Sequence, residues 1–275
     1  MLVLGFDFTS RPTSRKPITC SRCHLEGDAL LFDVLETHDD FDSFEAALRR
    51  SGSWVAGFDF PFGHSRRFVK GVGWPTEWPM YADHLSSLTR DNYEFILEDY
   101  KRDRPKGDKE HPRRFEVGTG AASPQKLYGV PVAKMLFEGV PRLRGAGLHL
   151  PGLSSGDPDR IGIEAYPGVL ARHLIGKRSY KSDERSKNTP DRAAARRAIL
   201  EGLRSAMLKD TYGLTVTAPD WLAEAPDADS LDSFLCAVQA AWAWRKFRSD
   251  NQFLANVDGL EGWIADPSAF RRAEV

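Results

Sequence analysis

Two short apolar runs, each with one aspartate near its end, dominate the hydrophobic pattern of the chain. They cover residues 2–9 and 54–61, and each joins β-branched and aromatic residues to a following turn. Such runs predict buried strands. A carboxylate inside a buried strand is costly unless it is paired or binds a metal. If the two strands are neighbours, Asp7 and Asp59 mark a candidate cation site.

The residues between these runs predict a regular order of elements. Alternating apolar positions over residues 18–25 and 29–37 predict two more strands, which would form an antiparallel meander with the first. A capping-box-like pattern at Asp42 opens a helix over residues 42–50. The first sixty residues therefore predict strand, strand, strand, helix, strand.

Regularity is lost between residues 62 and 150, where several prolines interrupt the pattern. Helices are predicted over residues 91–102 and 131–138. We interpret 62–150 as an insertion or lid within a single domain that covers residues 1–275. A lid of this kind would determine the substrate.

The last part of the chain predicts a fifth strand over residues 161–167, which contains Glu164, and three helices. The helices cover residues 168–175, 191–208 and 229–247. The last has an apolar stripe at helical spacing. Asp229 and Asp232 are three residues apart, so they share a face of this helix, at the predicted border between core and surface.

Composition describes an ordinary globular protein. The 275 residues are 41% hydrophobic and 28% charged, with a formal net charge of −1. No apolar stretch approaches the roughly 18 residues of a membrane span. The N-terminus shows no basic segment with a cleavage site, so we expect a cytoplasmic protein. Bases cluster in residues 101–114 and 172–204, where they can attract phosphates or simply form solvated helix faces.

The three cysteines offer little chemistry. Cys20, Cys23 and His24 match the C-x-x-C-H spacing of haem attachment and half of a zinc site. A zinc site needs a second ligand pair, and only Cys236 remains. We expect reduced thiols on a strand.

Acids at the ends of separate elements are the main candidates for chemistry. Carboxylates that converge from several elements suit Mg²⁺ or Mn²⁺, and two such ions about 4 Å apart catalyse phosphodiester hydrolysis without a nucleophilic side chain. Each acid also has a structural alternative: turn hydrogen bonds, helix capping or, for Glu164, an ion pair with Lys126 or Lys181. The candidate catalytic residues are Asp7, Asp59, Glu164, Asp229 and Asp232.

This order of elements and acids resembles the ribonuclease-H-like superfamily. More closely, the chain resembles a domain-of-unknown-function family of bacterial and archaeal proteins expected to be ribonuclease-H-like nucleases. The resemblance implies an α/β fold with a mixed five-stranded sheet flanked by helices, and an insertion after the fourth strand. The matching stretches are residues 5–10, 57–63, 120–124, 132–139, 164–168, 229–237 and 261–264.

The resemblance also implies roles for the acids. Asp7 would bridge two metal ions, Asp59 would be the second ligand and Asp232 the third. Asp229 resembles the additional helix acid of resolvase-type members. Glu164 has no clear counterpart in the minimal superfamily pattern, because it lies on a later strand.

The leading functional hypothesis is a metal-dependent nuclease with a short or structured DNA or RNA substrate. Near-neutral charge and an acidic first lobe disfavour tight, nonspecific binding to long duplexes. Three bases are predicted to bind substrate. They are Lys126, Lys181 and Arg114. Trp74 or Trp78 would stack on bases, or else close a loop.

Two other functions stay open. One is a phosphotransferase or ATPase of the actin-like fold, where a first strand also carries Gly-x-Asp-x-Thr as in Gly5 to Thr9. Such proteins usually duplicate the domain, and this chain is too short for two copies. The other is a non-catalytic module that binds nucleic acid or protein.

Overall fold

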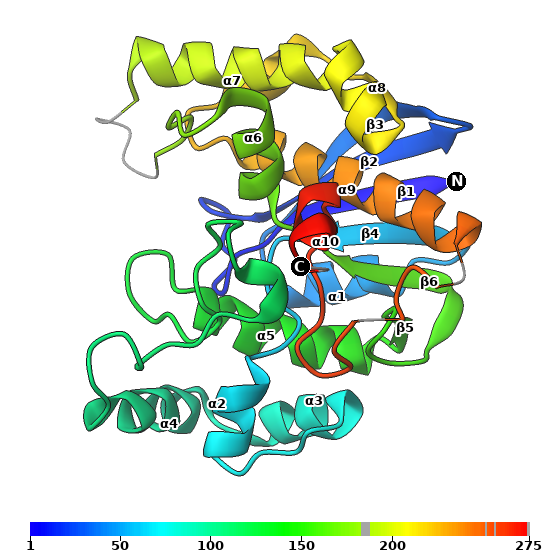
Figure 1. Ribbon diagram of the computed structural model, residues 1–275. Coiled ribbons are helices and arrows are strands. Elements are labelled where there is room, and N and C mark those ends of the chain that lie inside the picture. The colour runs from blue at the N-terminus through cyan, green and yellow to red at the C-terminus, as the bar shows by residue number, and fades with distance from the viewer. Residues whose placement is uncertain (183–187, 251, 256, 274–275) are drawn as a thin grey trace.

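A mixed seven-stranded sheet forms the centre of the computed structural model, which describes residues 1–182, 188–250, 252–255 and 257–273 (Figure 1). Its order is β5-β6-β4-β1-β2-β3-β7. The first three strands form the predicted antiparallel meander, while the other neighbours pair in parallel. The strands are β1 (Leu2–Asp7), β2 (Ile18–Glu26), β3 (Ala29–His38), β4 (Trp54–Phe58), β5 (Leu148–His149), β6 (Asp157–Glu164) and β7 (Thr215–Thr217).

The α/β class is confirmed, but the sheet has two more strands than the five predicted. The additional strands, β5 and β7, are two and three residues long and lie at the edges of the sheet. Segments this short carry no readable alternation of apolar and polar positions.

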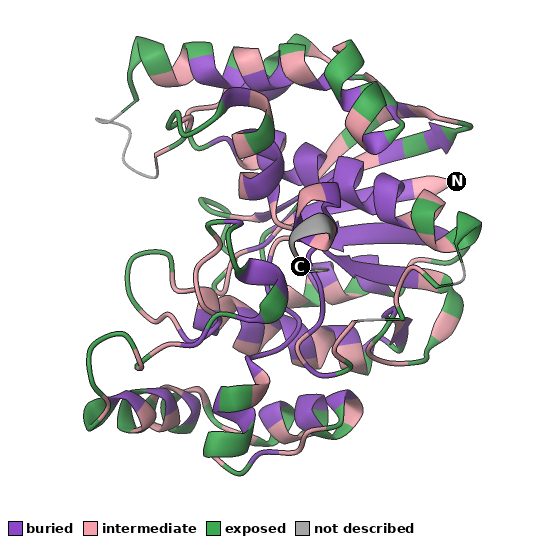
Figure 2. Cartoon of the chain, in the orientation of Figure 1, coloured by how far each residue is buried: buried purple, intermediate pink, exposed green. Residues whose placement is uncertain are grey.

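Helices cover both faces of the sheet and enclose a separate core on each (Figure 2). Helices α6 to α10 pack on one face, and α1 to α5 lie on the other side. The helices are α1 (Phe41–Leu48), α2 (Arg66–Gly71), α3 (Trp78–Ser87), α4 (Arg90–Arg102), α5 (Val132–Gly145), α6 (Pro167–Ile175), α7 (Pro190–Leu203), α8 (Ala206–Tyr212), α9 (Asp229–Ser249) and α10 (Pro267–Ala273).

Helix α9 lies directly across the sheet and is more deeply buried than predicted. Every residue from 231 to 243 is buried. A helix covered on all sides needs no single apolar stripe, so the predicted border between core and surface was wrong. Asp232 is fully buried as a result. The predicted helix over 191–208 is also two helices, because α7 ends at Leu203 and α8 begins at Ala206.

Residues 62–150 connect β4 to β6, which pair directly with each other. Helices α2, α3 and α4 gather at one end of the molecule (Figure 1), and α5 lies closer to the sheet, where Gly139 packs against the ring of Phe60. Of the two alternatives for the tryptophans, stacking on bases does not fit the structure. Trp74 and Trp78 are buried in the core, and the Trp78 indole donates to the carbonyl of Phe62 at 2.7 Å.

Two expectations from composition can be compared with the structure. All three cysteines are buried free thiols, and Cys20 and Cys23 lie on β2 as predicted. Within the described part of the chain, no helix combines the length and the apolar character that crossing a membrane requires.

Candidate functional site

The three parallel strands β1, β4 and β6 place acids at one edge of the sheet. Asp7 ends β1, Asp59 directly follows β4, and Glu164 ends β6. Phe6 pairs with Phe58, and the backbone N–H of Asp59 donates to the carbonyl of Phe6 at 3.0 Å. Asp7 and Asp59 are therefore neighbours at the carboxyl ends of parallel strands, where open α/β sheets bind ligands.

Glycines beneath α9 explain how the helix reaches these aspartates. Gly5 and Gly57 each stand two residues before an aspartate, so glycine and aspartate share a face of the strand. A Cβ atom at Gly5 would overlap the backbone of α9 at Ser233, and one at Gly57 would overlap it at Cys236. The helix therefore rests on the strand backbones without intervening side chains.

Two further contacts fix this arrangement. On the α9 side, the hydroxyls of Ser21 and Ser233 are 2.7 Å apart. On the opposite face, the rings of Phe6 and Phe58 stack with centroids 4.9 Å apart. In each Gly-Phe-Asp run, the glycine thus faces α9 and the phenylalanine faces the opposite core. The close approach of α9 to the glycines brings Asp232 towards Asp7 and Asp59.

The aspartates repel one another in a poorly solvated place. Burial raises the pKa of Asp7 well above its ordinary value, Lys181 opposes this, and Asp229, Asp232 and Asp59 add to it. Burial likewise raises the pKa of Asp59 to about 7 and that of Asp229 to about 6. Among the described contacts, no hydrogen bond is donated to the carboxylate of Asp7 or of Asp59. Both residues are partly exposed.

Asp232 differs because two side chains bind it. The hydroxyl of Tyr180 donates to one carboxylate oxygen at 2.8 Å, and the ammonium of Lys181 binds the other. Burial opposes the charge of Lys181, but Asp232, Asp7 and Asp59 raise its pKa well above the ordinary value. The Lys181 side chain is 44% exposed. Among the described residues, Lys181 is the ammonium that acts on Asp7, Asp59 and Asp232, and Lys16 also acts on Asp229, so the four aspartates outnumber the cations that oppose their repulsion.

These carboxylates fit a hard divalent cation by donor type and charge. The fit is incomplete in spacing. Among the described residues, the only group of three or more candidate ligands whose atoms all lie within 4.8 Å of one another is Cys20, Glu36 and His38. No three of the described aspartates therefore have their ligand atoms within 4.8 Å of one another. In a two-ion site the ligands are divided between ions about 4 Å apart, so the carboxylates of such a site can lie farther from one another than the ligands of a single ion.

The cluster on β2 and β3 is a weaker candidate. The carboxylate of Glu36 already pairs with Arg22 at 3.0 Å and with Arg50 at 2.6 Å. Two guanidinium groups at that carboxylate oppose a cation there.

Glu164 belongs to a separate, compensated cluster. Arg113 donates to both of its oxygens, and the backbone N–H of Phe62 donates to one of them at 2.9 Å. Arg113 also pairs with Glu116 at 3.0 Å, and all three side chains are buried. Burial raises the pKa of Glu164, which Arg113 opposes, and burial raises that of Glu116 to about 7. The alternative of an ion pair for Glu164 is therefore confirmed, but its partner is Arg113 and not Lys126 or Lys181.

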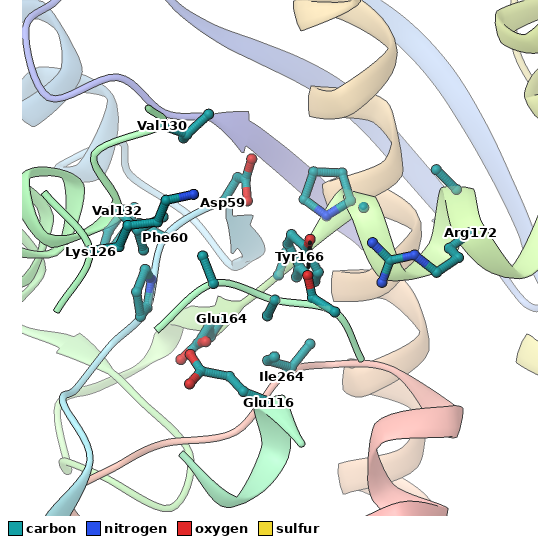
Figure 3. Close-up of a pocket in the computed structure, with 18 of the residues that line it drawn as sticks. Asp59, Phe60, Glu116, Lys126, Val130, Val132, Glu164, Tyr166, Arg172 and Ile264 are labelled. Atoms are coloured by element: carbon teal, nitrogen blue, oxygen red, sulfur yellow. Dashed lines mark hydrogen bonds between the residues drawn. The ribbon is translucent and has the colours of Figure 1, made fainter. Parts of the chain in front are cut away.

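A cavity of about 720 Å³ lies beside Asp59 (Figure 3). Lys126 and Lys181 line it, as expected of substrate-binding bases, whereas Arg114 is not among its described lining residues. The backbone N–H of Arg114 instead donates to Glu261 at 3.0 Å. The cavity is also lined by residues that were not individually predicted to belong to the site. These are Arg113, Glu116, Tyr166, Arg172 and Tyr180.

The two basic stretches differ in what they offer to a ligand. Most described bases of residues 101–114 are used internally; for example, Lys101 is buried and pairs with Glu110 at 3.0 Å. In residues 172–204, Arg196 is buried among backbone carbonyls, but Arg172 lines the cavity. Only the second stretch contributes several bases to the site.

Comparisons of the chain with models of protein families, with curated proteins and with solved structures found no match. Any account of function therefore rests on the geometry of the site.

Proposed function

We propose that the protein is a metal-dependent nuclease that hydrolyses phosphodiester bonds at Asp7, Asp59 and Asp232. The observation that carries this proposal is the charge surplus of these aspartates. They converge from β1, β4 and α9, Lys181 is the one described ammonium that opposes their repulsion, and they adjoin a cavity lined by bases. A cluster of this kind is stabilised by a divalent cation.

The arrangement of the elements supports the ribonuclease-H-like expectation. The antiparallel strands β1 to β3, helix α1 and strand β4 follow one another in the expected order, and a late helix, α9, supplies the last acid. The short edge strands β5 and β7 extend the expected five-stranded core.

Mg²⁺ or Mn²⁺ would be held by Asp7, Asp59 and Asp232, with Asp229 close by, and would supply Lewis-acid activation of water and stabilisation of the leaving oxygen. The chain's own groups prepare the site. Asp7 and Asp59 must lose their protons before they bind a cation, so affinity rises with pH through about 7. Tyr180 orients the carboxylate of Asp232, and the Lys181 ammonium binds its other oxygen, where a cation would replace it.

The remaining candidates take supporting roles in this proposal. Lys126 and Arg172 neutralise phosphate charge in the cavity. Glu164 is a positioning residue. Its carboxylate ends β6 and accepts hydrogen bonds from Arg113 and from the backbone of Phe62, so it holds these two segments together beside the cavity.

Calorimetric titration with Mn²⁺ and Mg²⁺ tests the metal site, and cleavage of short single- and double-stranded oligonucleotides tests the activity. We expect the wild type to bind metal, Asp7→Asn to bind it at least about tenfold more weakly, and turnover to fall by about a hundredfold or more. Asp39→Asn, at an exposed position, is the matched control. Cleavage that survives in both Asp7→Asn and Asp59→Asn would falsify the proposal.

A further inference from the structure

The cavity beside Asp59 is enclosed by two walls. Residues 116–132 form one wall, and α6 with residues 176–181 forms the other. Figure 3 shows Lys126 and Arg172 extending into the space from opposite sides, with Asp59 and Tyr166 between them. Arg172 also donates to the carbonyl of Thr119, so it ties the two walls together.

Four of the lining bases have no acidic partner among the residues that the structure describes. In the described ranges, no carboxylate lies within 4.0 Å of the charged groups of these four, whereas Arg113 on the floor is held by two glutamates. Unpaired cations around a concave site are suited to phosphate groups. The four bases are Lys126, Arg172, Lys177 and Arg178.

The outer edge of the first wall is apolar and exposed. Val117, Tyr128 and Val130 are 60%, 66% and 56% exposed. The ammonium of Lys126 lies 5.2 Å from the centroid of the Tyr128 ring. An exposed aromatic ring beside a cation with no acidic partner is the combination on which unpaired nucleobases stack.

Size then restricts the ligand. A cavity of about 720 Å³ lies in the range of roughly 300–1,000 Å³ that encloses small ligands, and a duplex cannot enter it. A flexible single strand can place its last nucleotide inside while the preceding base remains at the edge.

We propose that this cavity binds the unpaired end of a nucleic acid strand, with a base on Tyr128 and the terminal phosphates between Lys126 and Arg172. The inference rests on the proposed function for its chemistry. Water adds to phosphorus, the bond from phosphorus to the leaving sugar oxygen breaks, and that oxygen takes up a proton. The enzyme would then release nucleotides from an end.

Fluorescence anisotropy in a chelating buffer tests binding apart from cleavage. The probes are a short single-stranded oligonucleotide with an internal dye, the same sequence closed into a circle, and a blunt duplex. We expect the linear strand to bind at least about tenfold more tightly than either, because only it has an unpaired end. Lys126→Gln and Tyr128→Ala should each weaken its binding by about tenfold.

Lys106→Gln and Phe95→Ala are the matched controls, since both residues are exposed and neither lines the cavity. Equal affinity for linear and circular strands, or no binding of the linear strand, overturns the inference. Metal-dependent cleavage of linear and circular strands at equal rates overturns it but leaves the proposed function. Selective binding of ends without cleavage in Mg²⁺ or Mn²⁺ supports the inference and overturns the proposed function.

Discussion

Two groups of acids lie beside the same cavity, and their charges are handled in opposite ways. Glu116 and Glu164 are buried around Arg113, whose guanidinium and backbone, with the backbone of Phe62, satisfy their oxygens. Asp7 and Asp59 are partly exposed and accept no hydrogen bond from the described residues. Both groups contain carboxylates with raised pKa values, so a raised pKa alone does not identify a functional acid.

The compensated group stabilises the fold, whereas the uncompensated group costs stability in the absence of a ligand. Arg113 connects distant segments of the chain, because its guanidinium binds Glu116 and Glu164 and also donates to the carbonyl of Glu261 at 2.6 Å. A carboxylate without a partner stays available to a cation. Three substitutions test this difference.

Removing the guanidinium should have the largest effect. Arg113→Met leaves two buried carboxylates unpaired, so we expect the free energy of unfolding to fall by about 3–5 kcal/mol. Urea denaturation measures it. Arg114→Met, at the exposed neighbouring position, should change the value by less than about 1 kcal/mol. If Arg113→Met does not fold, adding Glu116→Gln and Glu164→Gln should restore folding. A loss no larger than that of Arg114→Met would contradict the role of Arg113.

The second substitution removes an uncompensated charge. The pKa of Asp59 is about 7 in the folded protein and about 3.9 in the unfolded chain. The folded state therefore holds the extra proton between these values, and wild-type stability falls as the pH rises from 4 to 7. Asp59→Asn should gain roughly 4 kcal/mol over the wild type between pH 4 and pH 8 in metal-free buffer, since each pKa unit of the roughly three-unit difference corresponds to about 1.36 kcal/mol. Denaturation at both pH values measures this, with Asp39→Asn as control. A difference that does not change with pH would show that Asp59 is adequately solvated.

The third substitution removes the partial compensation. Lys181→Met removes the ammonium that a cation must displace from the carboxylate of Asp232, so we expect Mn²⁺ to bind about tenfold more tightly above pH 7, by calorimetry. Lys177→Met, which removes a cavity base with no acidic partner among the described residues, should change the affinity much less. Weaker binding in Lys181→Met would mean that the amine orients Asp232 for the metal instead of competing with it.

Local patterns predicted the central elements and the neighbouring aspartates. The repeated Gly-Phe-Asp of residues 5–7 and 57–59 combines strand propensity with an acid at the strand end, and both properties are local. The meander and the helices α1, α4, α6 and α9 follow from the same kind of pattern.

Local patterns could not predict the contacts between segments that are distant in the sequence. Arg113 meets Glu164 across 51 positions of the chain, and nothing in a basic stretch distinguishes a buried arginine from a solvated one. Tyr180 and Lys181 lie in an irregular segment whose approach to α9 depends on tertiary packing. Trp74 and Trp78 next to prolines left open whether they stack on bases or close a loop, and α3 carries Trp78 into the core.

The contact of α9 with Gly5 and Gly57 has a consequence for how the site responds to change. Because backbone meets backbone there, no rotamer can alter the distance between helix and sheet, and the acids are preorganised before any ligand arrives. Binding then requires little ordering of the protein, which leaves more of the interaction energy for the ligand. The same rigidity makes the site sensitive to substitution, because a single added methyl group at either glycine overlaps the backbone of α9 and would have to push the helix, with Asp232, away from the sheet.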